Sequence, residues 1–263
     1  MKKLILCADD FGLSAGISRG IIDLAQSGRL SAVGCIVNQP EFVVQAPTLL
    51  ALKNQVQIGL HFNLTEGAFL SRPEQNGIGL NKLLLQSHLH LLNKQLIANE
   101  FKAQLDKFIQ VMDRLPDFID GHQHVHQFPV IRKIILNAYD KRLRLNKTYI
   151  RSTYPAISLL PYLFKAKILA MTGGRALLRA LKQRNIPHNM YFSGIYDFKP
   201  GSNYRQIFQK WLQAMPSDTL IMCHPGQGFD AQDPIAAARI IEYDYFRCAF
   251  FLEDLQKYKV EMS

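Results

Sequence analysis

The sequence has few cysteines, and their spacing excludes the common zinc-ribbon and redox motifs. The four cysteines among its 263 residues share no Cys-x-x-Cys pair: Cys7, Cys35, Cys223 and Cys248. Three of them stand in apolar stretches typical of strands or helices, so we expect buried, reduced thiols rather than disulfides or metal ligands. We therefore predict a cytoplasmic protein, because persistent disulfides are typical of oxidising compartments.

Long apolar runs are missing as well. No uninterrupted apolar stretch is long enough to span a bilayer. The first strand-like run begins at Leu4, directly after two lysines, and lacks the longer apolar region and cleavage site of a secretory signal. Low-complexity segments, solenoid repeats and a GxGxxG motif after a strand are also absent. With 48% hydrophobic residues the chain can bury a full core, and we expect a single domain over residues 1–263.

Acidic residues are fewer than basic ones, at 21 against 31, which gives a net charge of +10. The basic residues gather mainly in residues 133–147 and 165–184, where we expect solvated helix faces. Since no recognisable nucleic-acid-binding module accompanies them, we predict no nucleic-acid partner.

Residues 154–199 are predicted to be a variable insertion. A helix packed on the domain is favoured there, with a lid, a dimer surface or a helix resting on a membrane as alternatives, the last suited to a lipid-linked substrate.

Strand-like apolar runs alternate with helical patterns along the chain. We predict strands over residues 4–8, 32–37, 56–61, 118–121, 149–151 and 219–223. Helices are expected over residues 15–27, 42–52 and 129–141, with longer helical stretches over 81–115 and 233–258. This alternation implies parallel strands joined by crossover helices, so the predicted fold is α/β, a closed or nearly closed (β/α) barrel of about seven strands. An open doubly wound sheet is the alternative fold.

Four clusters of acids and imidazoles follow strand-like runs. They are Ala8-Asp9-Asp10-Phe11-Gly12, Gly59-Leu60-His61-Phe62-Asn63, Asp120-Gly121-His122-Gln123-His124-Val125-His126 and Met222-Cys223-His224-Pro225-Gly226. In a parallel barrel, side chains at the carboxyl ends of the strands converge on one mouth. Each cluster alone is as compatible with a helix cap, a turn or a core histidine as it is with a functional site. Together they predict a divalent-metal site.

Asp10, His61 and His122 are the predicted metal ligands, because one carboxylate and two imidazoles leave coordination positions for water and substrate. A bound metal can make hydroxide available near neutral pH and polarise a carbonyl. Adjacent residues of an extended strand point to opposite sides, so Asp9 is expected to do a different task and to act as general base. His224, on a late strand, is the expected proton donor to the leaving group.

His124 and His126 follow His122 at two-residue spacing, which on a strand would place all three imidazoles on one face. His122 lies nearest the strand end and is preferred as ligand, with His124 and His126 as substitutes. Asp120 is expected to orient a ligand imidazole, and Arg151 to hold that carboxylate or a substrate oxygen. Four aromatic residues beside these clusters either line the floor of a sugar-sized pocket or belong to the core: Phe11, Phe62, Phe128 and Tyr154.

The four motifs, in this order, resemble the YdjC-like carbohydrate deacetylase family, which includes chitooligosaccharide deacetylases and hopanoid-associated deacetylases. The resemblance rests on residues 8–14, 59–65, 120–129 and 222–226 and extends over most of the chain, whereas residues 154–199 carry little of it. It implies a seven-stranded (β/α) barrel related to polysaccharide deacetylases, often found as a homodimer. It also implies hydrolysis of the acetyl group of an N-acetylated sugar, with release of acetate.

The family's site residues can be carried over one by one. The resemblance places its metal ligands on Asp10, His61 and His122, the catalytic base of the wider superfamily on Asp9, and its late-strand histidine on His224. The family metal is usually magnesium, whereas a carboxylate with two imidazoles suits zinc or another transition ion at least as well. The chain departs from the family at position 123, where it has glutamine and chitooligosaccharide deacetylases typically have histidine. If this position contacts the substrate, we expect the accepted sugar to differ from that of the chitooligosaccharide deacetylases.

Two other functions stay open at this point. One is a metal hydrolase that acts on another bond, such as a phosphoester or a cyclic amide, with the same site. The other is a protein without catalysis that binds anionic lipid or nucleic acid through the basic residues 165–184.

Overall fold

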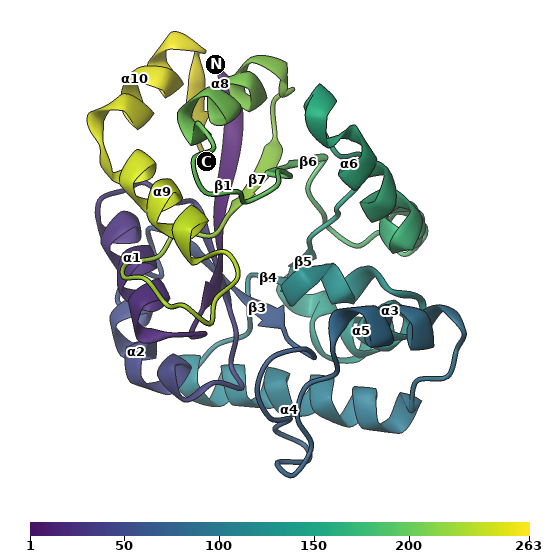
Figure 1. Ribbon diagram of the computed structural model, residues 1–263. Helices are drawn as coiled ribbons and strands as arrows, with labels where there is room; N and C mark the ends of the chain where they lie inside the picture. Colours follow the sequence, from purple (N-terminus) through teal and green to yellow (C-terminus); the bar gives the residue numbers. More distant parts are fainter.

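A single sheet of parallel strands curls around the centre of the molecule, with helices packed on its outer side (Figure 1). The computed structural model describes all residues from 1 to 263. The strand order is β5-β4-β3-β2-β1-β7-β6, and β8 pairs with the start of β1. The strands are β1 (Lys2–Phe11), β2 (Ala32–Cys35), β3 (Gln57–Phe62), β4 (Phe118–Gly121), β5 (Tyr149–Ile150), β6 (Tyr191–Ser193), β7 (Thr219–Cys223) and β8 (Val260–Met262).

The predicted helices are present, but two predicted stretches each divide into two helices, and the helix over Tyr204–Ala214 was not predicted from the sequence. They are α1 (Ala15–Gln26), α2 (Pro40–Leu50), α3 (Leu80–His88), α4 (Lys94–Met112), α5 (Pro129–Arg142), α6 (Leu163–Leu169), α7 (Arg175–Gln183), α8 (Tyr204–Ala214), α9 (Ala236–Arg247) and α10 (Ala249–Lys257). The stretch predicted over 81–115 is two helices, because the Asn93 side chain caps α4 by accepting from the Leu96 N–H. The stretch over 233–258 divides at Cys248, whose backbone is extended. None of these helices combines the length and hydrophobicity needed to cross a bilayer.

The sheet stays open between β5 and β6, which do not pair with each other. Residues 155–157 cross this gap: the Ile157 N–H donates to the Phe192 carbonyl at 2.7 Å, and the Phe192 N–H donates to the Pro155 carbonyl at 3.1 Å. The predicted barrel of about seven parallel strands is therefore confirmed as a curled half-barrel, and the doubly wound alternative is wrong.

Two apolar clusters lie on opposite sides of the sheet, because successive strand residues point to opposite faces. The larger, with 58 buried residues, packs the sheet against the outer helices and includes Leu6 and Ala8 of β1. The smaller has 8 buried residues on the concave side, among them Cys7 and Phe118. All four cysteines are free, and three of them are buried, as the sequence predicts.

Candidate metal centre

The concave face carries the polar residues of the candidate site, directly beyond the small apolar cluster. Asp9 on β1 and Asp120 on β4 each lie two positions after a residue of that cluster, so both carboxylates continue the inner face. His61 stands between two β3 residues of the outer cluster and therefore also points inward. Gly34 on β2 leaves room for its ring, since a Cβ there would lie 3.2 Å from Nδ1 of His61.

A bulge at the end of β1 brings two adjacent carboxylates into one cavity. The pairing of β1 with β2 shifts register between Ala8 and Phe11, and Asp10 has a φ of 72°, in the left-handed region. The expectation that neighbouring aspartates point to opposite sides is therefore wrong here, since Asp9 and Asp10 both line the cavity. Their partners still differ, because Asp9 contacts Arg151 and Asp10 contacts imidazoles.

The three histidines after β4 do not share a strand face, contrary to the prediction. His122 begins a short 3-10 segment, and the backbone at His124 and at the residue before it is left-handed, with φ of 59° and 51°. His126 is buried and places Nε2 3.1 Å from the Arg151 carbonyl, away from the other ligands. His124 lines the cavity, but His122 is the one of the three that contacts Asp10.

Asp10, His61 and His122 bring three ligand-type atoms together. Oδ1 of Asp10 lies 2.8 Å from Nδ1 of His122 and 3.4 Å from Nε2 of His61. Ligand atoms about 2.1 Å from a common divalent ion lie about 3.0 to 3.4 Å apart at angles of roughly 90° to 109° at the metal. The 3.4 Å separation lies in this range, whereas the 2.8 Å separation is that of a hydrogen bond between Asp10 and His122. The three atoms are close enough to share one ion, and the donor set is one that transition ions accept.

Asp120 fixes the ring of His61. Nδ1 of His61 donates to Oδ1 of Asp120 at 2.7 Å, which leaves its other ring nitrogen facing Asp10. Burial opposes charge on this imidazole, yet the carboxylates of Asp120 and Asp9 raise the pKa of His61 to about 10. The surrounding carboxylates thus favour positive charge at this position, which is the charge that a divalent cation brings.

Arg151 lies buried beneath the centre and joins two of its carboxylates. Its Nη1 and Nη2 each lie 2.7 Å from an oxygen of Asp9, and Nη2 also lies 2.6 Å from Oδ2 of Asp120. Burial would raise the pKa of Asp9, but Arg151 and then His61 bring that pKa below its usual range. Asp9 is therefore held ionised, in a fixed direction, on the wall of the cavity.

A second buried arginine, Arg239 of α9, holds the other oxygen of Asp10. Its Nη2 lies 2.8 Å from Oδ2 of Asp10, and its Nε lies 2.5 Å from Oδ2 of Asp233. Burial would raise the pKa of Asp10, but His122 and Arg239 together bring it well below its usual range. Sequence reasoning missed Arg239, because it lies inside an ordinary amphipathic stretch 229 residues from Asp10.

His224, at the end of β7, also lines the cavity. Its backbone N–H donates to Oε2 of Glu242 at 2.5 Å, and the Tyr196 hydroxyl donates to Oε1 of the same carboxyl group at 2.6 Å. Burial lowers the pKa of His224 to about 4, and Asp10 and Asp9 offset this effect only in part. His224 is therefore a neutral imidazole near pH 7. Its supporting Glu242, which is buried, was not singled out from the sequence.

One cavity of about 730 Å³ at the carboxyl ends of the strands is lined by both aspartates of β1, by Arg239 and by four imidazoles: Asp9, Asp10, His61, His122, His124 and His224. Its aromatic walls are Phe198, whose ring centroid lies 5.2 Å from that of His224, and Phe229, which is 68% exposed. Sequence reasoning named neither residue. The aromatic residues that it did consider do not line the cavity: Phe11, Phe62, Phe128 and Tyr154. The three phenylalanines belong to the core instead.

The fold and this donor set define a parallel half-barrel protein with a buried carboxylate–imidazole centre. The chain belongs to the family of YdjC-like proteins, whose family model matches residues 3–257. It is 33% identical over 141 residues to a carbohydrate deacetylase of Danio rerio, which covers 50% of this chain and 44% of the relative. It is 36% identical over 149 residues to a chitooligosaccharide deacetylase of Yersinia enterocolitica, which covers 55% of this chain and 58% of the relative. The match thus spans about half the length of these relatives.

One solved structure has the same fold over the whole chain. It comes from Enterococcus faecalis and is described as a candidate cellobiose-phosphate cleavage protein. The two structures align with a TM-score of 0.72 over 100% of this chain and 97% of the other, at 19% sequence identity. The similarity supports the half-barrel fold alone.

Proposed function

We propose that this chain is a metal-dependent deacetylase, which hydrolyses the acetyl group of an N-acetylated sugar or oligosaccharide, such as a chitooligosaccharide, and releases acetate. One observation supports the proposal most. Three ligand-type atoms lie close enough together to hold one divalent ion, and the fixed carboxylate of Asp9 lies on the wall of the same cavity. The names of the two relatives, carbohydrate deacetylase and chitooligosaccharide deacetylase, point to the same reaction.

Asp10, His61 and His122 would hold the cation. When bound, it would polarise the acetyl carbonyl and lower the pKa of a water molecule, so that hydroxide is available near neutral pH. The family resemblance favours magnesium, while two imidazole ligands favour zinc or another transition ion. The three buried aspartates around the centre outnumber its two buried arginines, so a cation also reduces the repulsion among the carboxylates.

Asp9 is the proposed general base. Its carboxylate is ionised at neutral pH because Arg151 lowers its pKa, so it can accept the proton of the attacking water. Arg151 holds both oxygens of Asp9 with charge-assisted hydrogen bonds and thereby fixes the direction of the free lone pairs. A carboxyl group with a low pKa also gives the proton up again readily.

His224 is the proposed proton donor to the departing amine. Because burial lowers its pKa to about 4, the free site holds this imidazole in its neutral form. His224 must therefore receive its proton during the reaction, and the proposed source is Asp9, which has taken that proton from the attacking water. In this scheme a single proton passes from water through Asp9 and His224 to the amine nitrogen, so the charge of the site is unchanged after each turnover.

The cavity suits a saccharide in size and chemistry. Its volume of about 730 Å³ lies within the range of about 300–1,000 Å³ found for small-molecule sites. Arg19, Glu66 and Gln123 line it with groups that hydrogen-bond hydroxyls, and Phe198 and Phe229 offer apolar faces to sugar rings. Gln123 stands where the resembling chitooligosaccharide deacetylases typically have histidine. We therefore assign to Gln123 an influence on which acetylated sugar is accepted.

The purified protein should be incubated with N-acetylglucosamine and its short oligomers, and the released acetate assayed. We expect acetate release that stops when a chelator removes the metal and returns when Zn²⁺ or Mg²⁺ is added. A parallel assay of phosphate release from sugar phosphates distinguishes a hydrolase of another bond. Phosphate release without acetate release, in the metal-loaded protein, would contradict the proposal.

A further inference from the structure

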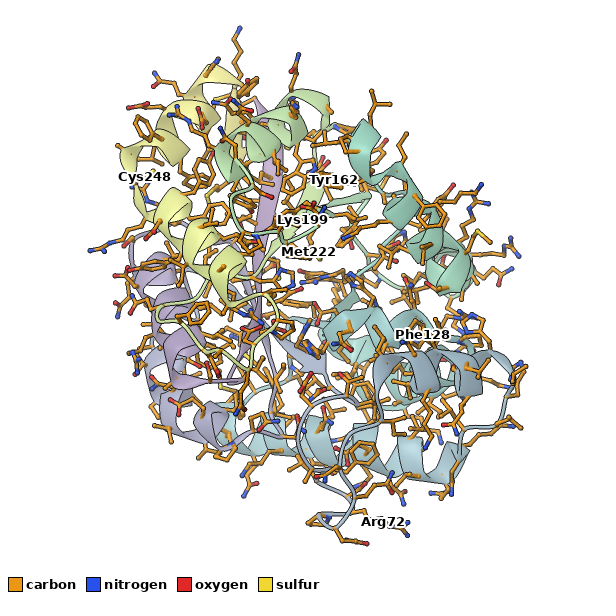
Figure 2. All side chains as sticks on the ribbon, viewed as in Figure 1. Arg72, Phe128, Tyr162, Lys199, Met222 and Cys248 are labelled. Carbon is orange, nitrogen blue, oxygen red and sulfur yellow. The ribbon has the colours of Figure 1, made fainter.

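The outer face of α6 and its flanking turns is apolar and open to solvent. Side chains project from this helix at the edge of the molecule (Figure 2). The exposed fractions are 84% for Leu160, 50% for Leu163, 74% for Phe164, 44% for Ile168 and 68% for Met171. These positions follow one another at spacings of one, three and four residues, so they form a single stripe along the helical segment.

The opposite face of the same segment is apolar too, and it is already used. Tyr162, Ala166 and Leu169 belong to or pack against the small cluster on the concave side of the sheet. A helix that is apolar on both faces is normally covered on both. In this chain only the inner face is covered, so the outer stripe is a contact surface without its partner.

The surrounding segment is strongly basic. Between residues 152 and 196 there is no aspartate or glutamate, and the charged residues are Lys165, Lys167, Arg175, Arg179, Lys182 and Arg184. Only Arg184 among these forms an ion pair, with Asp140. On α7 the exposed residues Arg175, Arg179 and Lys182 lie at positions i, i+4 and i+7, which is one helix face, while Leu177 and Leu181 are buried on the other.

We propose that residues 160–184 dock this protein on an anionic lipid bilayer. The apolar stripe of α6 would insert at the level of the headgroups, and the unpaired cations of α6 and α7 would bind their negative charge. Charge complementarity favours this partner over a second copy of the chain. A two-fold dimer through this face would place one basic surface against an identical one, and like charges across an interface oppose association.

The docking segment is joined to the wall of the cavity. The Lys165 ammonium donates to the Tyr196 carbonyl at 3.0 Å, and the Tyr196 ring lies 4.3 Å from that of Phe198, which lines the cavity. A bilayer bound by α6 would therefore lie close to the residues that shape the site. The proposal itself does not depend on the reaction, because it concerns only the binding of the chain to lipid.

Co-sedimentation of the full chain with vesicles tests the proposal. We expect binding to vesicles that contain phosphatidylglycerol, little binding to pure phosphatidylcholine, and a steep decrease with salt. Each of Lys167→Gln, Arg179→Gln and Lys182→Gln should weaken binding about fivefold, and Phe164→Ser about tenfold. The matched controls are Lys53→Gln and Lys94→Gln for charge, and Val44→Ser, a 67% exposed residue of α2, for the apolar contact.

Three results would overturn the proposal. The first is absence of binding to the anionic vesicles, and the second is an equal loss of binding in the control variants. The third is a dimer in light scattering that Phe164→Ser converts to a monomer while vesicles bind neither protein. In that case a second copy of the chain covers the stripe. Thermal melts of each variant confirm that the substitutions leave the fold intact.

Discussion

The guanidinium group of Arg151 faces the carboxylate of Asp9 through two hydrogen bonds of 2.7 Å each. Both side chains are buried, with exposures of 0% and 1%. Burying two charges costs desolvation energy, which their attraction offsets only when the geometry is good and other hydrogen bonds complete it. The main effect of the pair is therefore to hold the charged carboxylate of Asp9 in one direction, and its net contribution to stability is small.

Removing the arginine should be much more damaging than removing an exposed one. In Arg151→Met, Asp9 and Asp120 would both lose their buried partner, so we expect the free energy of unfolding to fall by about 3–5 kcal/mol. The matched control is Arg184→Met, which removes a partly exposed ion pair with Asp140 and should cost about 1 kcal/mol or less. Urea denaturation measures both values. Similar small losses in the two variants would show that the buried pair is not needed to compensate these carboxylates.

Asp9→Asn should separate catalysis from metal binding. The amide cannot accept the proton from water, so we expect turnover to fall by about 10²–10⁴-fold. Metal affinity should change little, because the ligand atoms belong to Asp10, His61 and His122. Acetate release and calorimetric metal titration provide the two readouts, and Asp113→Asn, on the surface, is the control. Unchanged turnover in Asp9→Asn would exclude Asp9 as the base.

Glu242 should make stability depend on pH in a predictable direction. Burial raises its pKa from 4.5 to about 7, although hydrogen bonds from Tyr196 and the His224 N–H oppose the shift. A carboxyl group whose pKa is raised by folding contributes its full stability below its unfolded pKa near 4.5. It loses that contribution as the pH rises through about 7, which amounts to about 3 kcal/mol by pH 8.

The variant Glu242→Gln removes this ionisation and keeps an oxygen to accept from the His224 N–H. We therefore expect the variant to gain stability relative to the unmodified protein as the pH rises. The difference in their free energies of unfolding should shift by up to about 3 kcal/mol in favour of the variant between pH 5 and pH 8. Urea denaturation at several pH values measures the difference. A difference that stays constant across this range would mean that Glu242 does not titrate there.

Much of the site could be predicted because its signals are local. Residues at the carboxyl ends of parallel strands meet at one mouth, so Asp10, His61 and His122 could be chosen from their places after strand-like runs. Alternation along each strand then decides which neighbours face inward. The half-barrel could be predicted in the same way, from strands that alternate with helices.

The parts that could not be predicted depend on distant contacts or on backbone irregularity. The bulge at Asp10 arises where β1 meets β2, so a strict alternation of side chains gave the wrong orientation for one aspartate. The left-handed residues after His122 likewise turn a spacing typical of a strand into a 3-10 segment. Arg239 and Glu242 come from α9, and only the folded chain shows that this helix supports the centre.

Metal binding by Asp10, His61 and His122 is tested most directly by calorimetric titration of the metal-free protein with Zn²⁺ and with Mg²⁺. We predict one site per chain, with affinity at least about 100-fold weaker in His61→Ala and His122→Ala because each loses a ligand. His124→Ala, a neighbouring imidazole that does not contact Asp10, is the matched control and should bind nearly as the unmodified protein does. Full binding by His122→Ala together with loss of binding by His124→Ala would contradict the assignment.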